Sequence, residues 1–204
     1  MQLSRLGLLT ILFALLFITS CSKKEQDLSE LDRKADVSFT QYISSYSQGL
    51  VSSQEVITIR LAEDLSSSFI NASNPNEYLS FSPKIRGKAQ WITNRTLEFT
   101  PTVPLTAGKK YVSTLRLNKL FEVEESHANF RFGFEVMTQN YDIIIDDLVS
   151  DESDPMRKQV IKGKLVTADF TDSIQMKKAI SFKQNGKALQ IQWLIDKSSG
   201  INHE

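Results

Sequence analysis

The strictest constraint on the fold of this chain is the alternation of apolar and polar residues between Asn129 and Val136. Phe130, Phe132, Phe134 and Val136 occupy every second position of this segment. Because successive side chains of a β-strand point to opposite faces, the pattern places four bulky side chains on one face. The segment is therefore predicted to be a strand that packs one face against a core.

Several further short runs are typical of strands and are separated by turn residues. They are residues 56–61, 78–81, 89–92, 96–99 and 111–117. Thr93–Arg95 lies between two of them and is predicted to be a hairpin turn. Residues 35–50 fit either a short helix or an edge strand. Short strands at this spacing predict an all-β fold, with an antiparallel Ig-like β-sandwich over residues 38–140.

An acidic, turn-rich stretch follows the predicted sandwich. Residues 141–157 carry six carboxylates, namely Asp142, Asp146, Asp147, Asp151, Glu152 and Asp154. We interpret the stretch as a solvated linker. Calcium binding at a domain junction is the alternative, although the carboxylates lack the fixed spacing of a calcium loop.

Residues 158–204 are expected to begin a second, incomplete β-domain. A faint repeat supports a second module, because Val160, Ile161 and Leu165 follow the spacing of Val56, Ile57 and Leu61. Chance similarity is the alternative. Trp91 and Trp193 take equivalent places in the repeat. Both are expected in the core, with exposed sugar-binding platforms as the alternative.

The amino terminus has the layout of a secretory signal. A basic start that includes Arg5 precedes an apolar run over residues 6–19, which is too short for a comfortable membrane span. Ile18–Cys21 resembles the lipobox of bacterial lipoproteins, with cleavage between Ser20 and Cys21. The resemblance implies acylation of Cys21, which would tether the chain to a lipid bilayer. An uncleaved signal anchor is the alternative.

This layout defines residues 1–20 as the signal peptide, which is expected to be helical, and residues 21–37 as a flexible, anchored stalk. The resulting location is the bacterial cell envelope. The outer membrane is favoured, and the inner membrane is the alternative. With Cys21 as the only cysteine, the folded part holds together without internal disulfides.

Composition and motifs argue against several functions. The 24 basic and 24 acidic residues balance, so the chain has no net positive charge that would attract nucleic acid. His127 and His203 stand far apart, and no further cysteine could join them in a zinc site. Nucleophile elbows, phosphate loops and calcium loops are absent from the sequence. We therefore expect no catalytic residues, metal or cofactor, and the chain is not predicted to be an enzyme.

Taken together, the sequence resembles the amino terminus of the bacterial alpha-2-macroglobulin family. The matching stretches are 39–53, 56–61, 81–91, 94–101 and 104–111. The resemblance implies a macroglobulin-like second domain and a membrane-anchored scaffold of a protease inhibitor, whose downstream regions trap target proteases. The thioester motif of that family needs a cysteine, and none follows Cys21. The alternative function is a surface Ig-like lipoprotein that binds glycan or a protein partner.

Overall fold

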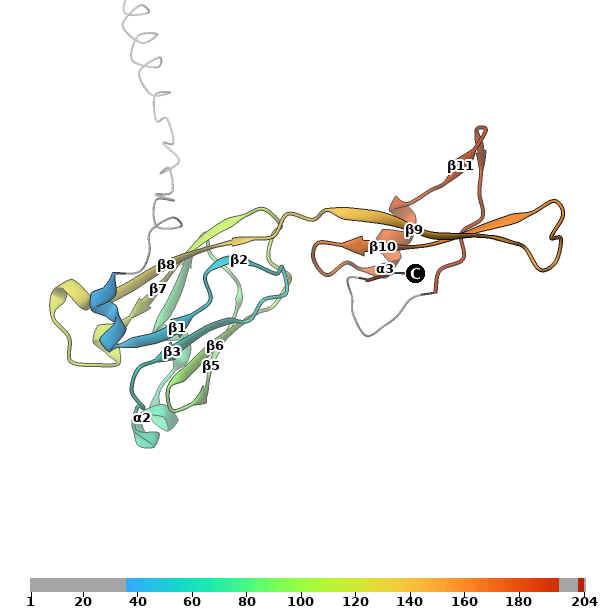
Figure 1. The fold of residues 1–204 in the computed structure, drawn as a ribbon. Coiled ribbons are helices and arrows are strands. Elements are labelled where there is room, and N and C mark those ends of the chain that lie inside the picture. The colour runs from blue at the N-terminus through green and yellow to red at the C-terminus, as the bar shows by residue number, and fades with distance from the viewer. Residues whose placement is uncertain (1–35, 195–201, 204) are drawn as a thin grey trace, which may run out of the picture.

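The computed structural model describes residues 36–194 and 202–203. Strands are the main secondary structure of the described chain and form largely antiparallel sheets, with a few short helices, so the predicted all-β fold is confirmed. Figure 1 shows two β units that lie end to end, joined by residues 137–140 between β8 and β9, here called the crossing segment. The expected signal helix and nearly all of the stalk lie outside the described residues.

The first unit is a sandwich of two four-stranded sheets with the orders β1-β3-β6-β5 and β2-β8-β7-β4. Adjacent strands are antiparallel except for β2 and β8, which are parallel. These orders match the ABED and CFG sheets of an immunoglobulin sandwich, with β2 added beside the last strand. The Ig-like prediction is therefore confirmed. The strands are β1 (Ile43–Tyr46), β2 (Gly49–Val51), β3 (Ile57–Leu61), β4 (Leu79–Ser82), β5 (Gly87–Thr93), β6 (Thr96–Pro101), β7 (Lys110–Arg116) and β8 (Asn129–Val136).

The core of the sandwich lies between its sheets and uses the predicted face of β8. Phe130, Phe132, Phe134 and Val136 are all nearly or fully buried. They belong to one apolar cluster with residues from the opposite sheet, including Ile59 of β3. Burying a side chain of this size stabilises a fold by roughly 1.5–3 kcal/mol, so this face supplies much of the packing free energy.

The described part of residues 35–50, which fit either a short helix or an edge strand, contains one helix followed by strands. The 3₁₀ helix η3 (Val37–Gln41) begins at Asp36, whose carboxylate accepts a hydrogen bond from the Ser38 amide. Strand β1 follows it. Ring contacts fasten the segment to the core, with Phe39 and Tyr46 at 5.2 and 5.1 Å from Phe130 between centroids. The remaining short helices of the unit are α2 (Ser67–Ala72), η4 (Pro75–Glu77), η5 (Leu117–Lys119) and η6 (Glu125–His127).

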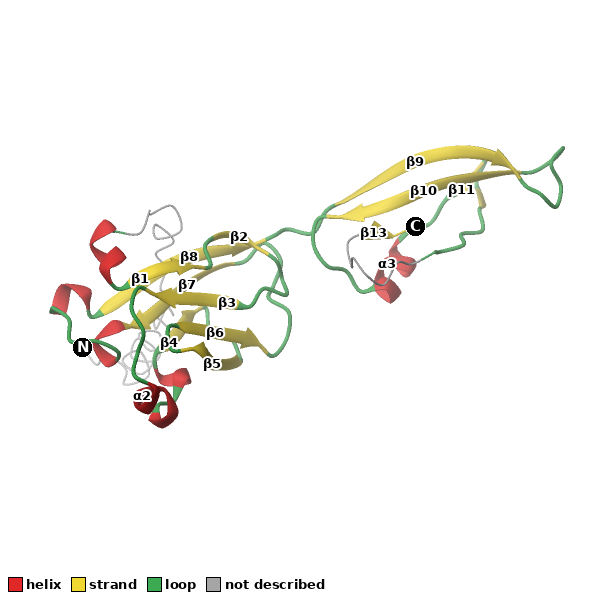
Figure 2. Ribbon diagram, turned by 60° about the horizontal axis from the view of Figure 1, so that its bottom comes forward, coloured by secondary structure: helices red, strands yellow, loops and turns green. Residues whose placement is uncertain are grey.

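The second unit is built on a long antiparallel hairpin of β9 (Tyr141–Ser150) and β10 (Gln159–Thr167). The interval 141–157, interpreted above as a linker, thus contains a strand and the turn after it. Three consecutive isoleucines, 143–145, favour this strand despite its aspartates. The other elements are α3 (Ser173–Ala179), β11 (Lys183–Gln184), β12 (Lys187–Ala188) and β13 (Asn202–His203), which pairs with β10. In Figure 2, α3 and β13 lie on the β10 side of the hairpin.

Candidate functional site: the junction between the two β units

A buried carboxylate lies where the second unit meets the sandwich. Asp169 follows β10 and is only 5% exposed. Removing a carboxylate from water is costly unless hydrogen bonds replace its hydration. The contacts of Asp169 therefore indicate what the junction is built to hold.

Both carboxylate oxygens of Asp169 accept hydrogen bonds from the sandwich. The Ser52 hydroxyl donates to Oδ1 and the Ser53 amide donates to Oδ2, each across 2.6 Å. The Phe170 amide donates to Oδ1 across 2.8 Å. Hydrogen bonds to an ionised acceptor are about twice as strong as neutral ones. The carboxylate therefore joins the loop between β2 and β3 to the segment after β10.

The loop that carries Ser52 and Ser53 is itself held to the sandwich. The Leu105 amide donates to the Ser53 carbonyl across 2.7 Å, and Leu105 is buried in the core. The Met137 amide donates to the Val51 carbonyl across 2.8 Å, just where the chain leaves β8. The loop that binds Asp169 is thus connected to the packed core of the sandwich and is not a free loop.

The main chain of Asp169 is fixed by Gln139, which lies in the crossing segment. The Gln139 side chain accepts from the Asp169 amide across 3.1 Å and donates to the Asp169 carbonyl across 3.0 Å. The Thr167 hydroxyl also donates to that carbonyl, and the Ala168 amide donates to Asn140. The crossing segment and the segment after β10 are therefore tied to each other as well as to the sandwich.

The electrostatics of Asp169 favour its ionised form. Burial raises the pKa of Asp169, but the hydrogen bonds from Ser52, Ser53 and Phe170 together lower it more. Its pKa therefore lies below the ordinary value for aspartate. At neutral pH the junction contains a charged acceptor that serine and backbone donors solvate.

The residues that carried the sequence predictions lie elsewhere. Ser20 and Cys21 fall outside the described residues, so cleavage and lipidation stay predictions. The six carboxylates are divided between β9 and the turn after it, where Asp151 accepts from both the amide and the hydroxyl of Ser153. The hydrogen bond from the Ser153 hydroxyl, followed by the one from the Ser153 amide, lowers the pKa of Asp151. Over residues 36–194, no group of three potential ligands is placed to hold a metal ion.

Neither tryptophan forms an open platform. The Trp91 ring is half-buried, and its Nε1 donates to the Ser73 hydroxyl across 3.2 Å. It packs 6.4 Å from the Tyr78 ring between centroids. Trp193 is half-buried as well. The feature that would have favoured sugar binding by the sandwich, an exposed aromatic face at Trp91, is therefore lacking. Within the described chain, no helix is long and apolar enough to cross a membrane.

Comparisons with known proteins give a limited result. No family model and no curated protein matches the sequence. Solved structures that match include an L,D-transpeptidase from Mycobacterium tuberculosis H37Rv, at 10% identity and a TM-score of 0.36, over 60% of this chain and 48% of that one. L,D-transpeptidase 3 from Mycobacterium tuberculosis matches at 9% identity and a TM-score of 0.37, over 61% of this chain and 46% of that one. An L,D-transpeptidase from Mycobacterium smegmatis matches at 11% identity and a TM-score of 0.35, over 73% of this chain and 50% of that one.

The matched regions span about half the length of these transpeptidases. At such identities and TM-scores the likeness carries no argument about reaction or substrate. None of these matching structures is a macroglobulin, and no macroglobulin model matches. The prediction of an alpha-2-macroglobulin lipoprotein is therefore wrong, and so is the protease-inhibitor scaffold that rested on it. The alternative of an Ig-like binder of glycan or protein gains no support either.

The local structure gives a physical reason for this error. The stretch Pro104–Tyr111, one of the five that carried the resemblance, is a turn that leads into β7. Leu105 fills the core, while Gly108 adopts a φ of +69°, a conformation that suits glycine. Turns of this kind occur in many β-sandwiches. The phrase therefore indicates turn geometry and not a particular family.

Asp169, in contrast, was not predicted from the sequence to be a functional residue. Its partners Ser52 and Ser53 lie 117 and 116 positions away, so no local spacing indicates the contact. An aspartate just after a strand is ordinary in a turn. Only the fold shows that this one is buried between two units.

Proposed function

We propose that this chain is a lipid-anchored, non-catalytic spacer of the bacterial cell envelope, in which the two β units act as one stiff arm. The observation that carries the proposal is the junction at Asp169. Its carboxylate contacts the sandwich, and its main chain contacts the crossing segment. Inter-domain contacts of ordinary chains are loose by default, so a buried, charged and fully bonded junction favours a fixed orientation.

The use of other buried polar groups supports a structural role. Besides Asp169, the buried polar side chains of the described residues are Thr167 and Ser113. Thr167 serves the same junction, and Ser113 lies within the core of the sandwich. Catalytic groups need an accessible and polar setting near one another. Asp169 and Thr167 are instead used to hold the two units together.

The anchor rests on the lipobox and on the energetics of acylation. A single acyl chain holds a protein to a membrane only marginally, whereas two or more chains hold it durably. Acylated Cys21 would supply several chains at one residue. The bilayer is thus the proposed partner, and the folded units would extend from it beyond the stalk.

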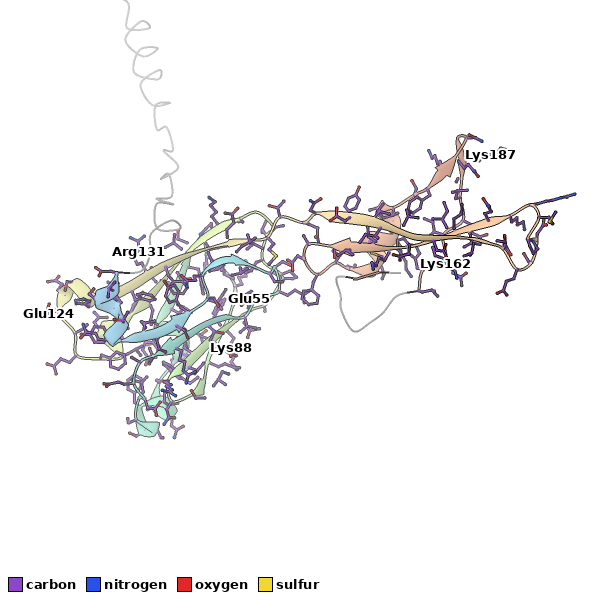
Figure 3. The ribbon with its side chains drawn as sticks, in the orientation of Figure 1. Glu55, Lys88, Glu124, Arg131, Lys162 and Lys187 are labelled. Carbon is purple, nitrogen blue, oxygen red and sulfur yellow. The ribbon has the colours of Figure 1, made fainter. Side chains whose placement is uncertain are left out.

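A distance measurement between spin labels tests the arm. The full-length chain would be purified from membranes in detergent with Lys88→Cys and Lys162→Cys, since both lysines are exposed and lie on different units (Figure 3). Acylation blocks Cys21, so only the introduced thiols take the label. We expect a narrow distance distribution that broadens with Asp169→Asn but not with Asp172→Asn, an exposed control three positions away. An equally broad distribution in all three proteins would reject the stiff arm.

A further inference from the structure

One edge of the second unit lacks a neighbouring strand. β9 is ten residues long and stands last in the sheet order β13-β10-β9. Within residues 36–194 and 202–203, no strand pairs with its outer edge, and Figure 2 shows this edge facing away from α3 and β13. Alternate amide and carbonyl groups of an edge strand point outward and form a ready template for another strand.

One face of β9 is apolar and exposed. Ile143, Ile145 and Leu148 are 43%, 58% and 55% exposed. Leu148 lies three positions after Ile145 and would face the other way in a regular strand. The register shifts between Lys162 and Gly163, and this bulge brings Leu148 to the face of Ile145. Ile161, paired with Leu148 and 57% exposed, extends the apolar surface onto β10.

The opposite face of β9 carries Asp142, Asp146 and Asp147 together with Ile144, which is 42% exposed and pairs with Lys164. Asp147 pairs with Lys162, and Asp146 lies 4.0 Å from the Lys164 ammonium group. Asp142 is paired with Val166, which carries no charge. Three carboxylates on β9 therefore meet two lysines on β10, and the outer side of β9 has no basic strand among the described residues.

We propose that the outer edge of β9 binds an extended segment of a partner polypeptide in which aliphatic and basic residues alternate. The added strand places its aliphatic residues beside Ile143 and Ile145, and its lysines or arginines beside the aspartates. β10 already has this composition and occupies the inner edge of β9. This inference concerns a surface away from the junction and goes beyond the spacer function.

A second copy of the chain fits this edge poorly. In an antiparallel β9–β9 pair, the register that joins Ile143 to Ile145 of the other copy also places Asp142 opposite Asp146. Like charges directly opposite each other destabilise a sheet. In that register, charge complementarity favours a basic partner over a self-pair.

The test uses a fluorescent peptide with the sequence of residues 159–167 and the full-length protein in detergent. A counterpart peptide replaces both lysines by glutamate, which preserves length and apolar residues. We expect saturable binding of the basic peptide, and we expect the acidic peptide to bind at least about tenfold more weakly. A protein with Asp142→Lys and Asp147→Lys should reverse this preference, while Asp64→Lys on the sandwich should leave it unchanged.

Equal binding of both peptides, or no saturable binding of either, would overturn the proposal. So would self-association of the protein, measured by light scattering, if the basic peptide does not compete with it. The comparison of two peptides on the unmodified protein does not depend on the folding of any variant. Thermal unfolding of the two charge-reversed proteins then shows whether their binding can be compared.

Discussion

The Ser52 hydroxyl donates a hydrogen bond to the Asp169 carboxylate across 2.6 Å and so joins residues 117 positions apart in the chain. Ser52 belongs to a loop of the sandwich, and Asp169 belongs to the second unit. The neighbouring Ser53 amide completes a two-point contact with the same carboxylate. Two donors on one rigid loop fix both the position and the direction of the segment that carries Asp169.

Replacing Asp169 by asparagine should destabilise the junction. The amide group of asparagine carries one acceptor oxygen instead of two, so a donor from Ser53 or Ser52 loses its partner. A buried group left unsatisfied in this way costs about 1–3 kcal/mol. We expect a lower urea midpoint for Asp169→Asn. The matched change Asp172→Asn should leave the midpoint nearly unchanged, because asparagine caps α3 as well as aspartate does. Equal midpoints for all three proteins would contradict the assigned role.

The contribution of Asp169 should depend on pH in the acid range. Its pKa in the folded protein lies below the ordinary value of about 3.9. The unfolded chain thus takes up the proton at a higher pH than the folded chain does. The stabilisation is complete above the ordinary pKa and is lost as the pH falls through the folded value. Urea midpoints from about pH 7 to about pH 2 should show the gap between wild type and Asp169→Asn closing only at the acid end. A gap that closes near neutrality would point to another group.

Phe134 and Ser113 test the packing of the sandwich in opposite directions. Phe134 is fully buried in the core, and Phe134→Ala should lower the free energy of unfolding by about 3–5 kcal/mol. The Ser113 hydroxyl is buried and has no hydrogen-bond partner among the described residues. Ser113→Ala removes this unsatisfied group, so it should leave stability unchanged or raise it by about 1 kcal/mol. Chemical denaturation measures both. Strong destabilisation by Ser113→Ala would reveal a partner for the hydroxyl.

Gly163 should be essential to the bulge between β9 and β10. A Cβ atom at this position would lie 2.4 Å from the Ile144 carbonyl oxygen, so the backbone must shift to accept it. Overpacking of this kind costs roughly 1–3 kcal/mol. We expect Gly163→Ala to increase amide hydrogen exchange in β9 and β10, whereas Lys162→Ala on the exposed surface should not. Unchanged exchange in Gly163→Ala would show that the hairpin accepts a Cβ atom at this position.

Cys21→Ser separates the two interpretations of the amino terminus. If Cys21 is the acylated first residue, the variant should lose incorporation of labelled palmitate and leave the membrane fraction. An uncleaved signal anchor would keep the variant in the membrane without incorporating the label in either protein. Metabolic labelling followed by fractionation distinguishes these outcomes.

The part of the fold that the sequence predicts is the part that local alternation encodes. The β8 pattern placed four residues on one face, and all four are buried there. β9 escaped prediction because aspartates are depleted in strands, and here they are tolerated on an exposed face opposite lysines. Strand β2 is only three residues long and pairs in parallel with a distant strand, which no local pattern indicates.

The junction could not be predicted for a related reason. The burial of Asp169 depends on the meeting of the β2–β3 loop, the crossing segment and the end of β10. None of these segments is distinctive on its own. Short phrases such as Pro104–Tyr111 were distinctive, yet they encode turns shared by many sandwiches. The family resemblance was thus drawn from features that fold geometry alone explains.

Hydrogen exchange at the Ser53 amide tests the stiff junction most directly, because this amide donates to the Asp169 carboxylate. We expect slow exchange in the wild type and exchange at least about tenfold faster in Asp169→Ala, which removes both acceptor oxygens; a loss of about 1.4 kcal/mol produces this factor. Exchange at Leu115, in the core of the sandwich, should stay unchanged. Equal exchange at Ser53 in both proteins would show that the contact does not hold the units together, and the spacer function would fail with it.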